Sequence, residues 1–146
     1  MSTTEQTLSV VREAFEALQA HDLDAFRALL SEEVVLRDPS TGALQQGPDV
    51  IVADMRGSME VFPDYRPGVE NLFADGEQAV AEIVRTGTNT GALEMPGGSI
   101  PPTGRAVRLP ECLIFRVREG KIVSMTSYAD QLHAMQELGL DPSQMG

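Results

Sequence analysis

The sequence predicts an α+β protein whose sheet is mostly antiparallel. Residues 7–20 place apolar side chains at helical spacing, whereas most of the second half of the chain alternates apolar and polar residues. Two short turn sequences, DG and EG, each join a pair of alternating segments and indicate β-hairpins. We expect the sheet to curve, with helices on its inner face and a conical cavity open at one end.

Three helices are predicted in the first half of the chain. The segment TLSVVREAFEALQA has four large apolar side chains on one helical face, at Leu8, Val11, Phe15 and Leu18. A second, short helix is predicted in DLDAFRALL, residues 22–30. A third begins near Asp49 and ends near Val61, because the prolines of FPDYRP cannot continue it.

Strands are predicted through most of the remaining chain. EEVVLRDP is a strand stopped by Pro39. GVENLFAD and QAVAEIVRTGTNTG form a hairpin around Asp75-Gly76, and AVRLPECLIFRVR and KIVSMTSYAD form another around Glu119-Gly120. The segment between the hairpins, ALEMPGGSIPPTG, is rich in Gly and Pro and is predicted to be irregular. The final helix, DQLHAMQELG, ends at Gly139, which gives the order α-α-β-α-β-β-β-β-α.

Composition restricts the classes of function. The 146 residues suit one domain, 1–146, and the net charge of -11 argues against nucleic acid and anionic membranes as partners. The sequence has neither a run of about 18 apolar residues nor a basic start before an apolar core, so we expect no membrane span, no signal peptide and a cytoplasmic location. Cys112 is the only cysteine and is expected to be a buried, inert thiol. Ten of the eleven basic residues are arginine, which suggests a GC-rich bacterial genome.

The second half of the chain resembles a known family. TGTNTGALEMPGGSIPPTGRAV followed by FRVREGKIVSMTSYADQLHAMQELG resembles the SnoaL-like polyketide cyclases of the NTF2-like superfamily, and FPDYR resembles the break after that family's third helix. The resemblance implies an NTF2-like cone. It also implies aldol-type ring closure of a polyketide-derived intermediate in antibiotic or other secondary metabolism, without metal or organic cofactor. It further implies a homodimer paired through the outer face of the sheet. The acid/base of the family, an Asp at the end of the last strand, matches Asp130.

Period-two alternation predicts which side chains accompany Asp130. In the last strand, Tyr128 falls on the same side as Asp130. In the preceding strand the mostly apolar face, taken as the inner one, contains Glu111. We therefore expect all three inside an apolar cavity, where desolvation makes a carboxylate more basic. The enolate formed there needs hydrogen-bond donors. The candidates for ligand binding are Tyr128, Glu111, Asn89, Arg85, His133 and, at the mouth of the cone, Asp38.

Each candidate also has a purely structural interpretation. Asp130 fits an N-cap whose side chain accepts from the backbone N–H of Leu132 or His133. Glu111 can be a core carboxylate paired with Arg85 or Arg37. Two histidines without helical or hairpin pairing make a zinc site improbable. Two alternatives to a cyclase remain open: another enzyme of this fold, an isomerase or epoxide hydrolase, and a non-catalytic module that binds a small hydrophobic or aromatic ligand.

Overall fold

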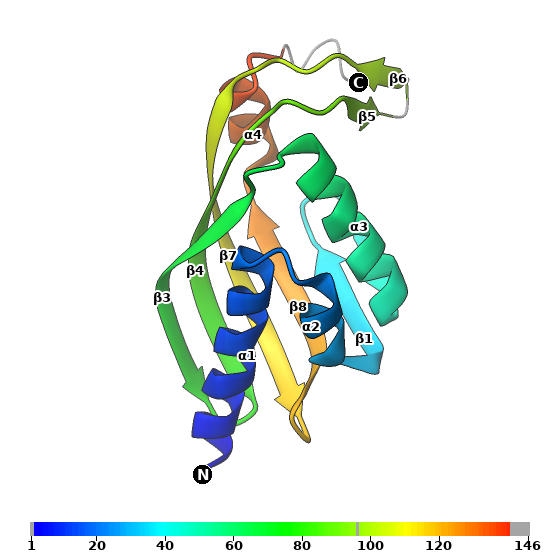
Figure 1. The fold of residues 1–146 in the computed structure, drawn as a ribbon. Helices are drawn as coiled ribbons and strands as arrows, with labels where there is room; N and C mark the ends of the chain where they lie inside the picture. The colour runs from blue at the N-terminus through cyan, green and yellow to red at the C-terminus, as the bar shows by residue number, and fades with distance from the viewer. Residues whose placement is uncertain (1, 96, 141–146) are drawn as a thin grey trace.

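The structure, a computed structural model, describes residues 2–95 and 97–140. A curved six-stranded sheet carries helices on its concave face, as predicted (Figure 1). The helices are α1 (Thr3–Gln19), α2 (Leu23–Ala28), α3 (Pro48–Val61) and α4 (Gln131–Glu137). The strands of the sheet are β1 (Leu30–Asp38), β2 (Ala43–Gln46), β3 (Arg66–Asp75), β4 (Gln78–Thr88), β7 (Ala106–Arg118) and β8 (Lys121–Ala129).

The sheet has the strand order β2-β1-β8-β7-β4-β3. Both predicted hairpins, β3–β4 and β7–β8, are confirmed, and only the β1–β8 pair is parallel among the described strands. Three short strands were not predicted. β2 returns along β1, and β5 (Leu93–Met95) and β6 (Gly98–Ile100) form a small hairpin within the segment that was expected to be irregular. Only three residue pairs join β5 to β6, too few for a clear alternation in the sequence.

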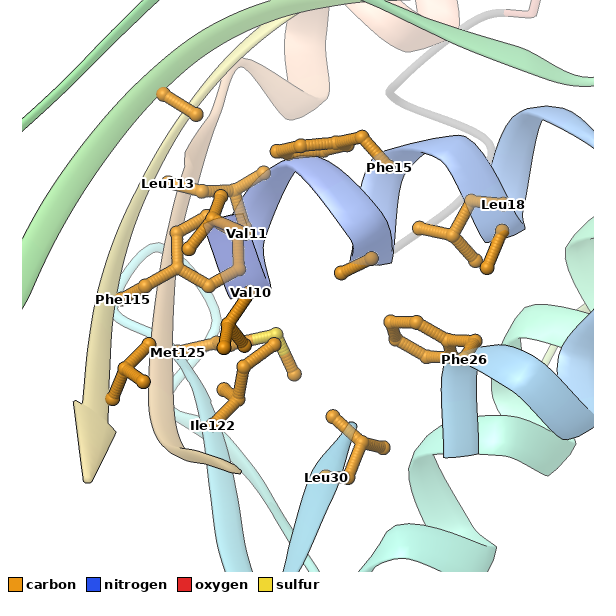
Figure 2. Close-up of a cluster of buried hydrophobic side chains, with 14 of the residues drawn as sticks. Val10, Val11, Phe15, Leu18, Phe26, Leu30, Leu113, Phe115, Ile122 and Met125 are labelled. Carbon is orange, nitrogen blue, oxygen red and sulfur yellow. The ribbon is translucent and has the colours of Figure 1, made fainter. Parts of the chain in front are cut away.

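The hydrophobic core lies between α1 and the concave face of the sheet (Figure 2). Phe15 of α1 meets Phe115 of β7 edge to face, with ring centroids 5.7 Å apart and an interplanar angle of 83°. Val11 and Ile122 are fully buried beside them. This packing fixes α1 across the sheet and leaves further inward-facing side chains of the strands to line a cavity.

A β-bulge changes the alternation of β8. Arg116 pairs with Ser124 but Val117 pairs with Ile122, so Val123 is an extra residue in β8. A bulge of one residue moves every following side chain to the other face of a strand. Ile122 and Met125, three residues apart, therefore both point into the core, with 0% and 5% exposure. Tyr128 and Asp130 therefore share a side, as alternation predicted, but this side is opposite to that of Ile122 and faces away from the core.

Candidate functional site

A cavity of about 330 Å³ opens on the concave side of the sheet. Its size falls within the usual range for small-molecule sites. Most of its wall is apolar and comes from three helices and the inner face of the sheet, including Phe15, Leu18, Phe26, Ile51, Met55 and Leu113. Figure 2 shows several of these side chains facing the space between α1, α2 and the sheet. The shape and lining suit a small, largely apolar ligand.

A charged pair and a hydroxyl lie on the strand side of this cavity. Arg85 Nε of β4 is 3.4 Å from Glu111 Oε1 of β7, and their side chains are 28% and 11% exposed. The Ser127 Oγ of β8 donates a hydrogen bond to Glu111 Oε2. Glu111 pairs directly with Ile83 and Ala129, so Arg85 and Ser127 are its diagonal neighbours on the same face. Each oxygen of the Glu111 carboxylate thus has a polar contact at the cavity wall.

Tyr65 adds a phenol to the same cavity. It lies in the turn after α3, is 5% exposed, and is fixed by contacts of its backbone with Phe62 and with His21 Nε2. Burial raises the pKa of Tyr65 to about 12, while the charge of Arg85 acts to lower this pKa and the charge of Glu111 to raise it. Tyr65 therefore keeps its proton at neutral pH. The sequence did not indicate Tyr65, because it stands in a turn without periodicity.

Two polar residues line the cavity from the other edge of the sheet. Asp38, a sequence candidate, ends β1, and its Oδ1 accepts hydrogen bonds from the backbone N–H and hydroxyl of Ser40. Gln45 of β2 was not a candidate, because β2 itself was not predicted. Its Oε1 is buried and has no hydrogen-bond partner among the described residues.

Tyr128 and Asp130 lie outside this cavity. Tyr128 is 50% exposed and borders a shallow depression on the convex face of the sheet, together with Asp130 and a half-buried Cys112. The prediction that Tyr128 lies inside the apolar cavity is wrong, because the bulge at Val123 turns it outward. Glu111 borders the convex depression as well, but its carboxylate contacts Arg85 and Ser127 at the wall of the apolar cavity. Asp130 is the N-cap of α4, and its Oδ1 accepts from the His133 N–H at 3.0 Å. The predicted capping role of Asp130 is confirmed, whereas its predicted place inside the apolar cavity is wrong.

Asn89 and His133 also lie away from the cavity lining. Asn89 is fully buried, and its Oδ1 accepts from both the backbone N–H and the hydroxyl of Thr103, at 2.9 and 2.8 Å. Its Nδ2 donates to the Gly91 carbonyl, so this side chain holds the loop of residues 101–105 against the end of β4. His133 Nε2 contacts the Arg108 carbonyl at 3.1 Å and packs α4 onto β7. Among the sequence candidates, Arg85, Glu111 and Asp38 line the cavity.

Within residues 2–95 and 97–140, no group of three or more His, Cys, Asp or Glu side chains is arranged to hold a metal ion. The same part of the chain contains no helix that is long and apolar enough to cross a membrane.

The curved sheet, the helices on its concave face and the enclosed cavity define an NTF2-like protein. The family model described as a SnoaL-like domain matches residues 11–125, which is most of the chain. The protein therefore belongs to the SnoaL-like family, whose structural relatives include proteins assigned as polyketide cyclases and as a ketosteroid isomerase.

Three solved structures illustrate the likeness of the fold. A protein assigned as a SnoaL-like polyketide cyclase from Jannaschia sp. CCS1 has a TM-score of 0.82 and 23% identity, with 97% of each chain covered. IdmH from Streptomyces antibioticus, assigned as a polyketide cyclase, has a TM-score of 0.78 and 24% identity, over 92% of this chain and 99% of IdmH. A protein from Xanthomonas campestris with the same assignment has 0.77 and 25%, over 94% and 99%. No curated protein matches the chain.

Proposed function

We propose that the protein is a cofactor-independent acid/base enzyme that closes a ring in a small, polyketide-derived keto compound, with Glu111 as the acid/base. The observation that carries this proposal is the Glu111 carboxylate, which is 11% exposed in the wall of an apolar cavity and lies beside Arg85. A general base must reach the proton that it removes from a bound substrate. Glu111 meets this requirement for a ligand in the cavity.

The reaction follows from the groups around Glu111. Its carboxylate takes a proton from a carbon between two carbonyl groups, and the charge that develops on the enolate oxygen is stabilised by the Arg85 guanidinium and the Tyr65 O–H. The enolate carbon then attacks a carbonyl farther along the same chain, which forms the new carbon–carbon bond. The resulting alkoxide takes the proton back from Glu111. A carbon between two carbonyls is acidic, so the step does not need a strong base.

The shape of the cavity supplies the remaining catalytic effect. An apolar space of about 330 Å³ holds a flexible chain in few conformers. Holding the two reacting carbons in contact removes the conformational freedom that the free chain would lose on ring closure, which raises the rate. Tyr65 and Arg85 both line this cavity, and the carbonyl that they bind is the one that becomes the enolate.

The family resemblance assigns the acid/base role to Asp130 instead. Asp130 is exposed and its Oδ1 accepts the His133 N–H as a helix cap. Asp130 does not line the apolar cavity, whereas Glu111 does and can reach a ligand bound there. These properties favour Glu111 over Asp130, and conservative variants of the two residues distinguish the assignments.

The test is hydrogen exchange at C1 of 2-tetralone, whose proton is activated by both a carbonyl and an aromatic ring. Proton NMR in deuterated buffer follows exchange catalysed by the protein. We expect Glu111→Gln to reduce the catalysed rate by about 10²- to 10⁴-fold, the usual contribution of a general base, and Asp130→Asn to leave it unchanged. Loss of the rate in Asp130→Asn alone would return the role to Asp130. Saturable binding without catalysed exchange in the wild type would favour a binding module.

We also propose that the protein is a homodimer that pairs through the convex face of the sheet. Support comes from large apolar side chains that this face leaves exposed, among them Phe73 (54% exposed), Ile114 (37%) and Tyr128 (50%). Helices α1, α2 and α3 lie on the opposite face (Figure 1), and no described part of the chain covers these side chains. Burial of such apolar area favours association.

A further inference from the structure

Two polar atoms in the cavity wall have no hydrogen-bond partner among the described residues. One is the donor Arg85 Nε, and the other is the acceptor Gln45 Oε1. The Arg85 Nε lies near Glu111 Oε1, but the 3.4 Å contact is an ion pair without hydrogen-bond geometry. Both atoms are buried, and buried polar atoms in folded proteins are nearly always paired.

Both side chains face the concave side of the sheet, but they come from strands that lie far apart in it. Gln45 pairs with Leu36, Leu36 with Met125, and Met125 with Phe115, so Gln45 extends a row of inward-facing side chains to the edge strand β2. Arg85 stands on β4, which is four positions from β2 in the strand order. Both residues line the same cavity, so a ligand that fills it can reach an acceptor on the β2 side and a donor on the β4 side.

We infer that Gln45 determines specificity, and that it selects ligands with a hydroxyl or N–H donor at the end opposite to a carbonyl held near Arg85. The inference rests on the proposed function, since that carbonyl is the reacting one. A ligand hydroxyl would give the Gln45 Oε1 its missing partner. A site with a buried acceptor discriminates strongly against an analogue that lacks the donor, because the acceptor then stays unpaired.

The test compares binding of two ligands that differ only in the donor. 6-Hydroxy-2-tetralone has a carbonyl at one end and a hydroxyl at the other, and 6-methoxy-2-tetralone lacks the donor. Isothermal titration calorimetry measures the dissociation constant of each. We expect the wild type to bind the hydroxy compound roughly 5- to 20-fold more tightly, the equivalent of one hydrogen bond to a buried acceptor. In Gln45→Met, which keeps the length but removes the acceptor, the ratio should fall to about one.

Gln46→Met is the matched control. Gln46 is the next residue of β2, is exposed and does not line the cavity, so its variant should keep the wild-type ratio. Equal binding of the two compounds by the wild type would contradict the inference, and would also be the result if the Gln45 amide were turned to present its NH₂ group. A preference that persists in Gln45→Met would equally overturn it.

A stability measurement separates ligand recognition from a structural role. If Gln45 Oε1 has no hydrogen-bond partner until a ligand binds, Gln45→Met removes an unpaired buried acceptor. The Tm of the free protein should then stay constant or rise. A lower Tm with unchanged selectivity would show that Gln45 only supports β2. Glu111-dependent exchange without the Gln45 effect would retain the proposed function and reject this inference. Gln45-dependent selectivity without Glu111-dependent exchange would retain the role of Gln45 and reject Glu111 as the acid/base. No saturable binding of either compound would reject both the proposed function and the role of Gln45.

Discussion

Arg85 Nε and Glu111 Oε1 lie 3.4 Å apart across β4 and β7, on the inner wall of the cavity. Arg85 and Glu111 stand on different strands. They meet only because the β4–β7 register sets Glu111 opposite Ile83, which is two residues from Arg85 on the same face of β4. The opposite charges of Arg85 and Glu111 offset the loss of solvation that each side chain undergoes in the cavity wall. Removing one partner therefore affects both the chemistry of the site and the stability of the protein.

Glu111→Leu should lower the free energy of unfolding by about 1–3 kcal/mol, because the Arg85 charge, only 28% exposed, would lose its partner. Glu111→Gln keeps an acceptor for the Ser127 hydroxyl and should have the smaller effect. Urea unfolding measures both. A Glu111→Leu variant more stable than the wild type would indicate that the pair is retained for function at a net expense in stability.

Asp130→Asn should leave stability within a few tenths of a kcal/mol, since Asn caps helices as well as Asp does. Asp130→Ala removes the acceptor of the His133 N–H and should cost about 1 kcal/mol. Hydrogen exchange of the α4 amides measures the local effect. Faster exchange in Asp130→Ala, with unchanged catalysis of 2-tetralone exchange, is the pattern of a cap. Loss of catalysis in both variants would contradict it.

The sequence predicted the parts of the fold that local patterns encode. The helices α1 and α3 have clear periodicity or clear stops, and the hairpin turns at Asp75-Gly76 and Glu119-Gly120 set the pairing of β3–β4 and β7–β8. Alternation in β7 also placed Glu111 on the inner face correctly. Each of these features depends on residues close together in the chain.

The rest depends on contacts that no local pattern records. The bulge at Val123 decides that Ser127 rather than Tyr128 faces Glu111. A strand with a bulge can have the same residue types as a regular strand, so the sequence does not reveal the bulge. Gln45 enters the cavity through β2, a four-residue strand formed only by pairing with β1. Tyr65 enters it from a turn. Two polar residues of the site, Gln45 and Tyr65, therefore come from segments without a sequence signal.

Tyr65 should titrate at a pH near 12, whereas an unfolded tyrosine titrates near pH 10. Because the pKa is raised in the folded state, the protonated phenol stabilises the fold fully below about pH 10, and this contribution is lost as the pH rises toward 12. Tyr128→Phe leaves Tyr65 as the single tyrosine, so ultraviolet absorbance of tyrosinate reports it alone.

Tyr65→Phe provides the control for this prediction. The free energy of unfolding of the wild type should fall relative to that of Tyr65→Phe by up to about 2–3 kcal/mol between pH 10 and 12. Urea unfolding of both proteins at several pH values in that interval gives the difference. A difference that is independent of pH would mean that Tyr65 titrates alike in the folded and unfolded states.

Ile114→Arg should convert the proposed dimer to a monomer, because it places a charge in the middle of the exposed apolar surface of the convex face. Light scattering coupled to size exclusion should give about twice the 15.8 kDa chain mass for the wild type and one chain mass for the variant. Val50→Arg is the control, since Val50 is 50% exposed but lies on α3, away from this face. A wild type of one chain mass would reject the dimer.

Asn89→Ala should destabilise the protein by about 2–4 kcal/mol without changing the KM or kcat of a cavity-bound substrate. The reason is that the Asn89 side chain makes three hydrogen bonds, to Thr103 and Gly91, while fully buried, and their loss leaves those groups unpaired. A ligand-binding role, which the sequence also allowed, gives the opposite pattern of a raised KM with little change in stability.

The variant Asn89→Asp separates the two roles further. It keeps the acceptor for Thr103 but turns a carboxylate oxygen toward the Gly91 carbonyl, so it should be destabilising as well, and its loss of stability should grow as the pH rises through the range in which a carboxyl group ionises. Urea unfolding across that pH range, together with steady-state kinetics at neutral pH, separates a residue that holds the loop from one that holds the substrate.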